Sequence, residues 1–276
     1  MHNFFNTVVQ PEIIQEPFPH LIIENALPDN LANELLESMP KFNDIKDKLF
    51  CTAYRFEDNG NPIEGSKYLL RRSKIAQIQE FPEIWKHLIE FQSNKISIER
   101  WWQIFSKQIS SYYPKQFEEL KAAESWNYGI RSNDSATDHD FLVDAELVYH
   151  APSSLTTQER GPHIKVRNKL MEFHYLLRHP NDDTKGGDFE IYKFKENCFI
   201  TYDSQQQIKN KNTLIPVKTI PYKHNQVIAW LNTPNTITAY SPRGPGIYPI
   251  HYMAAVFQLP KPLFALPNYS RSHSSN

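Results

Sequence analysis

The chain contains few glycines and few cysteines. Its 276 residues include eight glycines and two cysteines, Cys51 and Cys198. Phosphate-binding loops are built on clustered glycines, so eight scattered glycines give no support to a nucleotide-binding loop. Two cysteines far apart in the sequence indicate neither a disulfide framework nor a zinc site, and we expect both to be reduced thiols.

The chain also lacks an excess of charge of either sign. Its formal net charge of −1 at pH 7 gives no electrostatic reason to expect nucleic acid or an anionic membrane as a partner. No apolar run approaches the roughly 20 residues that span a bilayer. Residues 1–18 lack the basic and apolar pattern of a signal peptide. We therefore expect a cytoplasmic protein.

Helical periodicity marks the first 120 residues. A short strand is predicted within 16–28, followed by a helix within 28–40 that has its leucines on one face. Apolar residues recur every three or four positions over 81–92 and again over 98–114. This spacing predicts two amphipathic helices whose aromatic side chains pack into a core.

The rest of the chain is rich in β-branched and aromatic residues separated by Pro, Gly, Asn and Asp. The predicted strands fall within eight segments: 144–152, 161–166, 170–179, 186–194, 198–203, 219–232, 235–242 and 249–259. Eight short strands favour an antiparallel jelly roll. We expect one integrated domain with an N-terminal strand and supporting helices (1–120), a β core (121–260) and a flexible tail (261–276).

The order of these segments resembles the iron(II)- and 2-oxoglutarate-dependent oxygenases of the prolyl-hydroxylase type. The resemblance rests on "PFPHLIIENALP" ahead of a helix, on "GPHIKV" and "GGDFEIY", and on "IPYKHNQVIAWLNTPNTITAYSPR". It implies a mainly β fold, a double-stranded β-helix (jelly roll) supported by N-terminal helices. It also implies an iron ion held by two imidazoles and one carboxylate, and an arginine for the keto acid.

The chain departs from the pattern at most of these functional positions. His163 matches the first histidine, but Lys165 stands where the resemblance implies a carboxylate. The second histidine falls on Thr238, and the arginine falls near Ile250 or His251. An ammonium supplies no ligand oxygen and repels a cation by roughly 4 kcal/mol per unit charge at 4 Å and an effective dielectric near 20. We therefore expect no bound Fe(II) or 2-oxoglutarate.

The inherited pocket favours metal-independent acid–base chemistry on, or binding of, a small organic molecule. His163 and Lys165 alternate with the residue between them and so point to one side of a strand. A neutral His163 suits a general base, and Lys165 suits an acid, an anion holder or an imine former. Thr238, Tyr240 and His251 are the candidate hydrogen-bonding residues opposite. Lyase, isomerase or cyclase chemistry would fit this set.

Other interpretations stay open at this point. Lys165 could pair with Glu172 or Glu146 and merely fill the vacant ligand position. A rebuilt metal centre would use His163 and His174, giving an Fe(II)- and 2-oxoglutarate-dependent oxygenase with non-standard ligands. A third possibility is a non-catalytic protein that forms a homodimer or a complex with an active homologue. Arg243, on the turn "SPRGPG", is expected at the surface or at the lip of the pocket rather than in a catalytic role.

Overall fold

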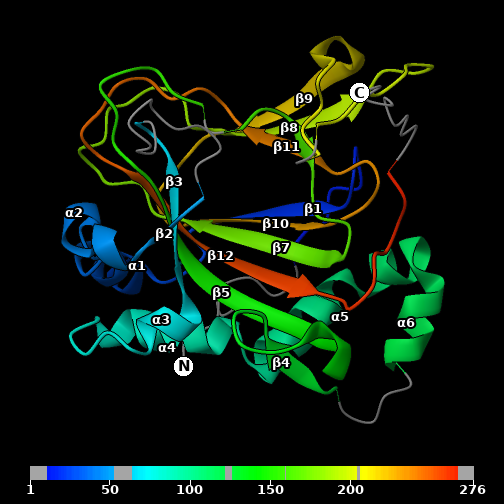
Figure 1. Ribbon diagram of the computed structural model, residues 1–276, viewed down its shortest axis with the longest axis horizontal. Helices are drawn as coiled ribbons and strands as arrows, with labels where there is room; N and C mark the ends of the chain where they lie inside the picture. Colours follow the sequence, from blue (N-terminus) through cyan, green and yellow to red (C-terminus); the bar gives the residue numbers. More distant parts are fainter. Residues whose placement is uncertain (1–10, 53–63, 122–125, 159, 204–205, 267–276) are drawn as a thin grey trace, which may run out of the picture.

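Two antiparallel sheets face each other in the computed structural model, which describes residues 11–52, 64–121, 126–158, 160–203 and 206–266. Figure 1 shows the larger sheet across the middle of the molecule and the smaller sheet above it. Helices cover the other face of the larger sheet. This is a jelly-roll core with supporting helices, so the predicted fold class is confirmed.

The larger sheet has eight strands. Its order is β1 (His20–Glu24), β10 (Gln226–Leu231), β7 (Lys169–Leu176), β12 (Ile250–Gln258), β5 (Phe141–His150), β3 (Lys67–Arg71) and β2 (Phe50–Cys51), with β4 (Tyr128–Ile130) parallel to β5. Strands from both ends of the chain thus lie in one sheet. The smaller sheet has the order β6 (His163–Ile164), β11 (Ile237–Tyr240), β8 (Phe189–Phe194) and β9 (Leu214–Ile220).

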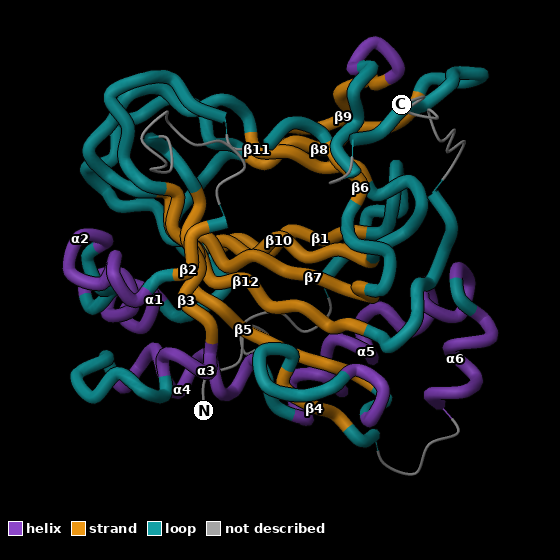
Figure 2. The backbone as a smooth tube through the Cα atoms, viewed as in Figure 1, coloured by secondary structure: helices purple, strands orange, loops and turns teal. Residues whose placement is uncertain are grey.

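The helices gather along the side of the larger sheet that faces away from the smaller sheet (Figure 2). They are α1 (Asp29–Glu37), α2 (Phe42–Ile45), α3 (Arg72–Ile75), α4 (Glu83–Gln92), α5 (Lys95–Tyr112) and α6 (Pro114–Lys121), with 3-10 turns η1 (Lys46–Lys48) and η2 (Ala136–Asp138). A third 3-10 turn, η3 (Lys211–Thr213), lies instead beside the smaller sheet, directly before β9 (Figure 2). Trp101 of α5 stacks on Phe173 of β7 at a centroid distance of 4.6 Å. The predicted aromatic helix face is therefore part of the core.

Side-chain alternation along the central strands divides the interior into two compartments. On β12, Met253, Ala255 and Phe257 join the core between the sheet and the helices. Their neighbours Tyr252 and Ala254 join the core between the two sheets. Because successive side chains of a strand point to opposite faces, the parity of a residue number on β12 decides which compartment its side chain enters.

The structure corrects one predicted strand. Residues 198–203 form no strand, apart from an isolated bridge between Tyr202 and Ile208. The segment makes backbone hydrogen bonds with Gln207 and Lys209, and the side chain of Asn210 supplies others. Its Oδ1 accepts from the backbone N–H and the hydroxyl of Thr201, each at 3.1 Å, and its Nδ2 donates to the carbonyl of Phe199. Side-chain bonds of this kind compete with sheet pairing.

Arg243 is partly buried and makes a specific ion pair. Its guanidinium donates to both carboxylate oxygens of Asp182, at 3.0 and 3.1 Å, and Asp182 is buried. The short loop between β7 and β8 is thereby tied to the turn before β12. Gly186, with a φ of 79°, lies so close to the carbonyl of Pro242 that a side chain would collide with it.

None of the helices described here is both long and apolar enough to cross a membrane. Residues 1–10 of the segment examined for a signal peptide, and residues 267–276 of the predicted flexible tail, lie outside the described residues.

Asn225 joins segments almost 200 residues apart. Its Oδ1 accepts from the N–H of Leu27 at 3.0 Å and from the hydroxyl of Tyr175 at 3.1 Å, and its Nδ2 donates to the carbonyl of Leu27 at 2.8 Å. We predict that Asn225→Ala lowers the free energy of unfolding by about 2–4 kcal/mol, because it leaves buried partners unsatisfied. Urea denaturation measures the change.

Asn197→Ala is the control for backbone strain in this experiment. Asn197 has a φ of 53°, close to the 55° of Asn225, but lies exposed on a loop. Its replacement should cost about 1 kcal/mol, the penalty of the left-handed conformation alone. Equal losses in the two variants would contradict the importance of the Asn225 hydrogen bonds.

Candidate functional site

Residues from six segments, three in each sheet, meet in a cavity between the two sheets. The larger sheet contributes Glu172 and His174, which share one face of β7 because they are two residues apart. On the smaller sheet, the segment containing β6 contributes His163, and β11 contributes Thr238, which is the register partner of His163. The full lining is Lys67, Arg160, His163, Lys165, Glu172, His174, Phe189, Thr238, Ala239, Tyr240 and Tyr252.

The cavity is small. Its volume of about 60 Å³ accommodates roughly four water molecules, taking about 15 Å³ for each. Pockets that enclose a drug-sized ligand have about 300–1,000 Å³. In this form the cavity therefore suits a small anion or one functional group of a larger molecule.

Glu172 is the carboxylate of the cavity. Its Oε2 lies 3.4 Å from Nζ of Lys169, and its Oε1 lies 3.5 Å from Nε2 of His174. Burial alone would raise the pKa of this carboxyl, but Lys165 and Lys169 outweigh it and hold the pKa of Glu172 well below its usual range. Glu172 is therefore an anion at neutral pH.

The charge on Glu172 determines which nitrogen of His174 carries the proton. A carboxylate only accepts, so Nε2 of His174 is protonated and Nδ1 accepts from the hydroxyl of Tyr240 at 2.7 Å. Burial lowers the pKa of His174 to about 3, despite the opposing effect of Glu172. Burial raises the pKa of Tyr240 well above its usual value, so its hydroxyl remains protonated. The result is a directed chain from Tyr240 through His174 to Glu172.

His163 has the opposite tautomer. Its Nδ1 lies 3.0 Å from the carbonyl oxygen of Gly161, which can only accept, so Nδ1 carries the proton and Nε2 carries the lone pair. Burial, followed by the charges of Arg160 and Lys165, lowers the pKa of His163 well below its usual value. The ring is therefore neutral and basic at Nε2.

Lys165 is a cation with a reduced affinity for its proton. Its Nζ lies 4.8 Å from the centroid of the Trp230 ring. Burial lowers the pKa of Lys165 to about 8, although the charge of Glu172 opposes this shift. The charged form of Lys165 therefore still predominates at pH 7, but its proton is lost more readily than that of a lysine in water.

Among the described residues that line the cavity, basic side chains outnumber acidic ones. Lys67, Arg160 and Lys165 line it together with one carboxylate, that of Glu172. The hydroxyl of Thr238 is buried, with 1% of the residue exposed, and its Oγ1 has no hydrogen-bond partner among the described residues. An unsatisfied buried hydroxyl beside basic side chains is the environment of an anion-binding site.

Four of the five predicted site residues therefore lie together, and the fifth does not. His163, Lys165, Thr238 and Tyr240 all line the cavity, and His163 and Lys165 face the same side as expected. His251 lies on the opposite face of β12, in a different cavity next to the helices. The expectation that it stands opposite Lys165 is wrong, because Tyr252 has the parity that points between the sheets.

Two of the cations could not be found from the sequence. Lys67 lies on β3, about 100 residues before His163, and the pairing of β3 with β5 brings it to the cavity. Arg160 precedes β6 in an irregular segment with no periodic pattern. Glu172 appeared only as a possible partner of Lys165, and the structure gives it contacts with Lys169 and His174 as well.

The side chains in the cavity do not fit an iron centre. Within the described part of the chain, no three His, Cys, Asp or Glu side chains are grouped so as to hold a metal ion. Both ring nitrogens of His174 already face partners, Tyr240 and Glu172, and the ammonium of Lys165 repels a divalent cation. Among the imidazole nitrogens of the cavity lining that the structure describes, Nε2 of His163 is the one with a lone pair left for a metal.

No protein-family model matches the chain, and no curated protein matches its sequence. Several solved structures are similar to it. A prolyl-4-hydroxylase from Pseudomonas putida is 9% identical with a TM-score of 0.45, and 87% of this chain and 92% of that one are covered. A prolyl 4-hydroxylase from Phytophthora capsici is 10% identical with a TM-score of 0.41, covering 87% and 58%.

A third similar structure is the viral collagen prolyl hydroxylase of Paramecium bursaria Chlorella virus-1 in a 2-oxoglutarate complex. It is 11% identical with a TM-score of 0.33, and 87% of this chain and 94% of that chain are covered.

The buried neutral histidines predict how stability depends on pH. The folded pKa of His174 is about 3, below the usual value of 6.5, so the unfolded state binds more protons between these values. Stability therefore falls as the pH drops below about 6.5, by up to about 1.4 kcal/mol per pH unit for each such histidine. We predict that between pH 6 and pH 4.5 the free energy of unfolding of His174→Gln changes less steeply with pH, with about one proton fewer taken up on unfolding. Urea denaturation across this range gives the slope.

His87→Gln is the matched control, because His87 is exposed on α4. The free energy of unfolding of this variant should change with pH as steeply as that of the unmodified protein. Identical slopes for the His174 and His87 variants would show that the imidazole of His174 is accessible to protons in the folded state.

Proposed function

We propose that the protein binds a small organic anion between its two sheets and transfers a proton on it without a metal ion. The observation that carries this proposal is the buried ammonium of Lys165 in the same cavity as the hydroxyl of Thr238, which is unsatisfied within the described part of the chain. The natural class of ligand is a small carboxylate with a carbonyl group next to an acidic C–H bond.

The anion would be held by charge and by directed hydrogen bonds. The ammonium of Lys165 and the guanidinium of Arg160 provide charge-assisted donors, which are roughly twice as strong as neutral ones. The hydroxyl of Thr238 is a further donor, with no competing partner among the described residues. Glu172 repels the ligand from one side and so favours a position near Arg160 and Lys165.

Bound anion would also activate the base. The cations Arg160 and Lys165 depress the pKa of His163, and an anion placed among them offsets their effect. Nε2 of His163 would then take the proton from carbon, and the C–H electron pair would move into the neighbouring carbonyl to give an enolate. The ammonium of Lys165 would hydrogen-bond to the enolate oxygen and, with a pKa of about 8, could return a proton.

Two other functions give different experimental results. An Fe(II)- and 2-oxoglutarate-dependent oxygenase with non-standard ligands would need His163 and His174 as ligands, although His174 is engaged at both nitrogens. A non-catalytic partner of an active homologue would need no ligand in the cavity. The charged lining supports neither of them as directly as it supports anion binding.

The binding test uses malonate at constant ionic strength, with EDTA present. We predict saturable binding by calorimetry, and at least a tenfold loss of affinity in Lys165→Met because a charge-assisted contact is removed. The bound anion raises the pKa of Lys165 from about 8, so binding at pH 8 should take up part of a proton. Heats measured in buffers of different ionisation enthalpy give the number of protons.

Lys193→Met is the control for this experiment, since Lys193 is exposed on β8. It should bind malonate and take up protons as the unmodified protein does. If malonate binds only after Fe(II) is added, or equally well to the Lys165 variant, the proposal of a metal-independent anion site is wrong.

Proton transfer is tested by deuterium exchange. Small keto acids, including 2-oxoglutarate and oxaloacetate, would be incubated with the protein in D₂O and EDTA, and the loss of C–H signal followed by proton NMR. We predict exchange above the buffer rate for at least one of them, and at least a hundredfold decrease in His163→Gln, which lacks the base. Malonate binding by the variant shows that its cavity is intact.

Anaerobic titration with Fe(II) and 2-oxoglutarate separates this proposal from the oxygenase. We predict no visible charge-transfer band at near-stoichiometric iron, because the available donors do not form a three-ligand site. A stoichiometric band that disappears in His174→Gln would establish the oxygenase instead.

A further inference from the structure

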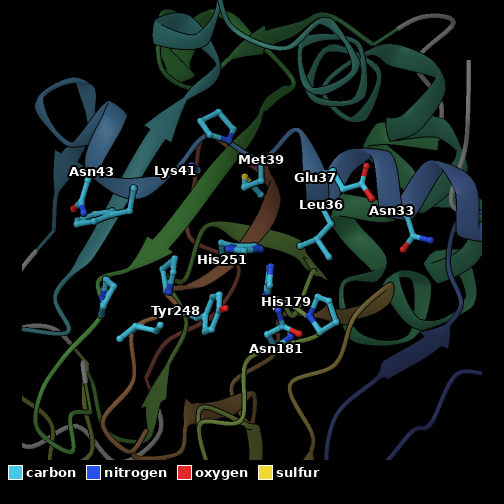
Figure 3. Close-up of a pocket in the computed structure, with 16 residues that line it drawn as sticks. Asn33, Leu36, Glu37, Met39, Lys41, Asn43, His179, Asn181, Tyr248 and His251 are labelled. Carbon is cyan, nitrogen blue, oxygen red and sulfur yellow. Dashed lines mark hydrogen bonds between the residues drawn. The ribbon is translucent and has the colours of Figure 1, made fainter.

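We infer that a second cavity, on the helix side of the larger sheet, binds an uncharged aromatic molecule. Figure 3 shows this cavity, with His251 between Leu36 and Met39 on one side and Tyr248 and His179 on the other. Its volume is about 590 Å³, which lies in the range of pockets that enclose whole small-molecule ligands. The inference does not depend on the proposed anion site.

The two cavities lie on opposite faces of one strand. His251 and Tyr252 are neighbours on β12, and their side chains enter different compartments. β12 is hydrogen-bonded to β5 along one edge and to β7 along the other. A ligand next to His251 is therefore separated from the inter-sheet cavity by the sheet itself.

His251 is the buried polar side chain of this cavity that a ligand would hydrogen-bond to. It is buried, with 6% of the residue exposed, and neither ring nitrogen makes a hydrogen bond of good geometry among the described residues, although the backbone of Leu177 lies close enough to the ring to interact with it. Burial, with help from His179 and Arg243, lowers its pKa to about 4, so the ring is neutral. A neutral imidazole has one N–H donor and one acceptor nitrogen, and leaving both unsatisfied in a buried position is costly.

The walls suit a flat apolar molecule. His179 and Tyr248 stack at 4.4 Å between centroids with an angle of 16°, forming an aromatic surface at one side. Met39 and Phe42 face the cavity from the N-terminal segment. Four prolines complete the wall and limit its movement: Pro40, Pro152, Pro180 and Pro249. A wall fixed in advance lowers the conformational cost of binding.

The charges of the lining exclude a strongly ionic ligand. The Asp, Glu, Lys and Arg side chains that line the cavity are Glu37 and Lys41, and their charges cancel. This differs from the inter-sheet cavity, where basic side chains outnumber acidic ones among the described lining residues. An uncharged ring with one group that can both donate and accept, such as a carboxamide, matches the apolar walls and the unsatisfied imidazole together. Ile247, 82% exposed, supplies apolar surface at the entrance.

The test uses 2-naphthamide as the probe, followed by saturation-transfer NMR and by the ¹⁵N signals of the histidine rings. We predict saturable binding with a shift of the His251 ring nitrogens. Affinity for naphthalene, which has the ring but no amide, should be at least tenfold weaker, as should affinity for 2-naphthoate. His251→Phe should bind 2-naphthamide at least tenfold more weakly, because the hydrogen bond is lost.

Two further variants keep the inference falsifiable if His251→Phe does not fold. Leu36→Trp fills the cavity from the surface of α1, where Leu36 is half-buried, and should abolish binding of the amide. Lys165→Met, in the other cavity, should leave it unchanged. Absence of saturable binding, or equal affinity for naphthalene and 2-naphthamide, would overturn the inference, and so would loss of binding in Lys165→Met.

Discussion

The buried carboxylate of Glu172 holds the inter-sheet site together. Lys165 and Lys169 face it, and without its charge the burial of two ammonium groups so close to each other would be strongly unfavourable. The same carboxylate orients His174 and, through it, the hydroxyl of Tyr240. The charges, tautomers and proton positions of the cavity therefore all depend on one residue of β7.

The cavity contains two imidazoles and a carboxylate, yet these groups interact with one another or with the backbone. Nε2 of His174 faces the carboxylate of Glu172, and the hydroxyl of Tyr240 hydrogen-bonds to Nδ1, the other ring nitrogen of His174. His163 is tied by its Nδ1 to the backbone of its own segment. The types of donor thus match a metal site, but their directions do not. Chemistry in such a site follows hydrogen bonds and charge rather than ligand count.

The sequence predicted the fold better than it predicted the site. Period-two and period-3.6 patterns located the central strands and the helices α4 and α5, because those elements bury continuous apolar faces. The pattern of segment 198–203 predicts a strand, but the side chain of Asn210, seven residues beyond its end, bonds to the backbone of Phe199 and Thr201 where a strand would bond to a neighbour. Lys67 reaches the cavity only through long-range pairing, which no local pattern reveals. The error at His251 was one of parity, since a shift of one residue reverses the face of a strand.

That parity has a consequence for how the protein can change. β12 is held along both edges, so its backbone is unable to slide or rotate when a single side chain is replaced. Even-numbered side chains of β12 then enter the space between the sheets, and odd-numbered side chains enter the space next to the helices. Substitutions at even-numbered positions change the cavity between the sheets, and substitutions at odd-numbered positions change the cavity next to the helices. Each cavity could acquire a new ligand preference over time without disturbing the preference of the other.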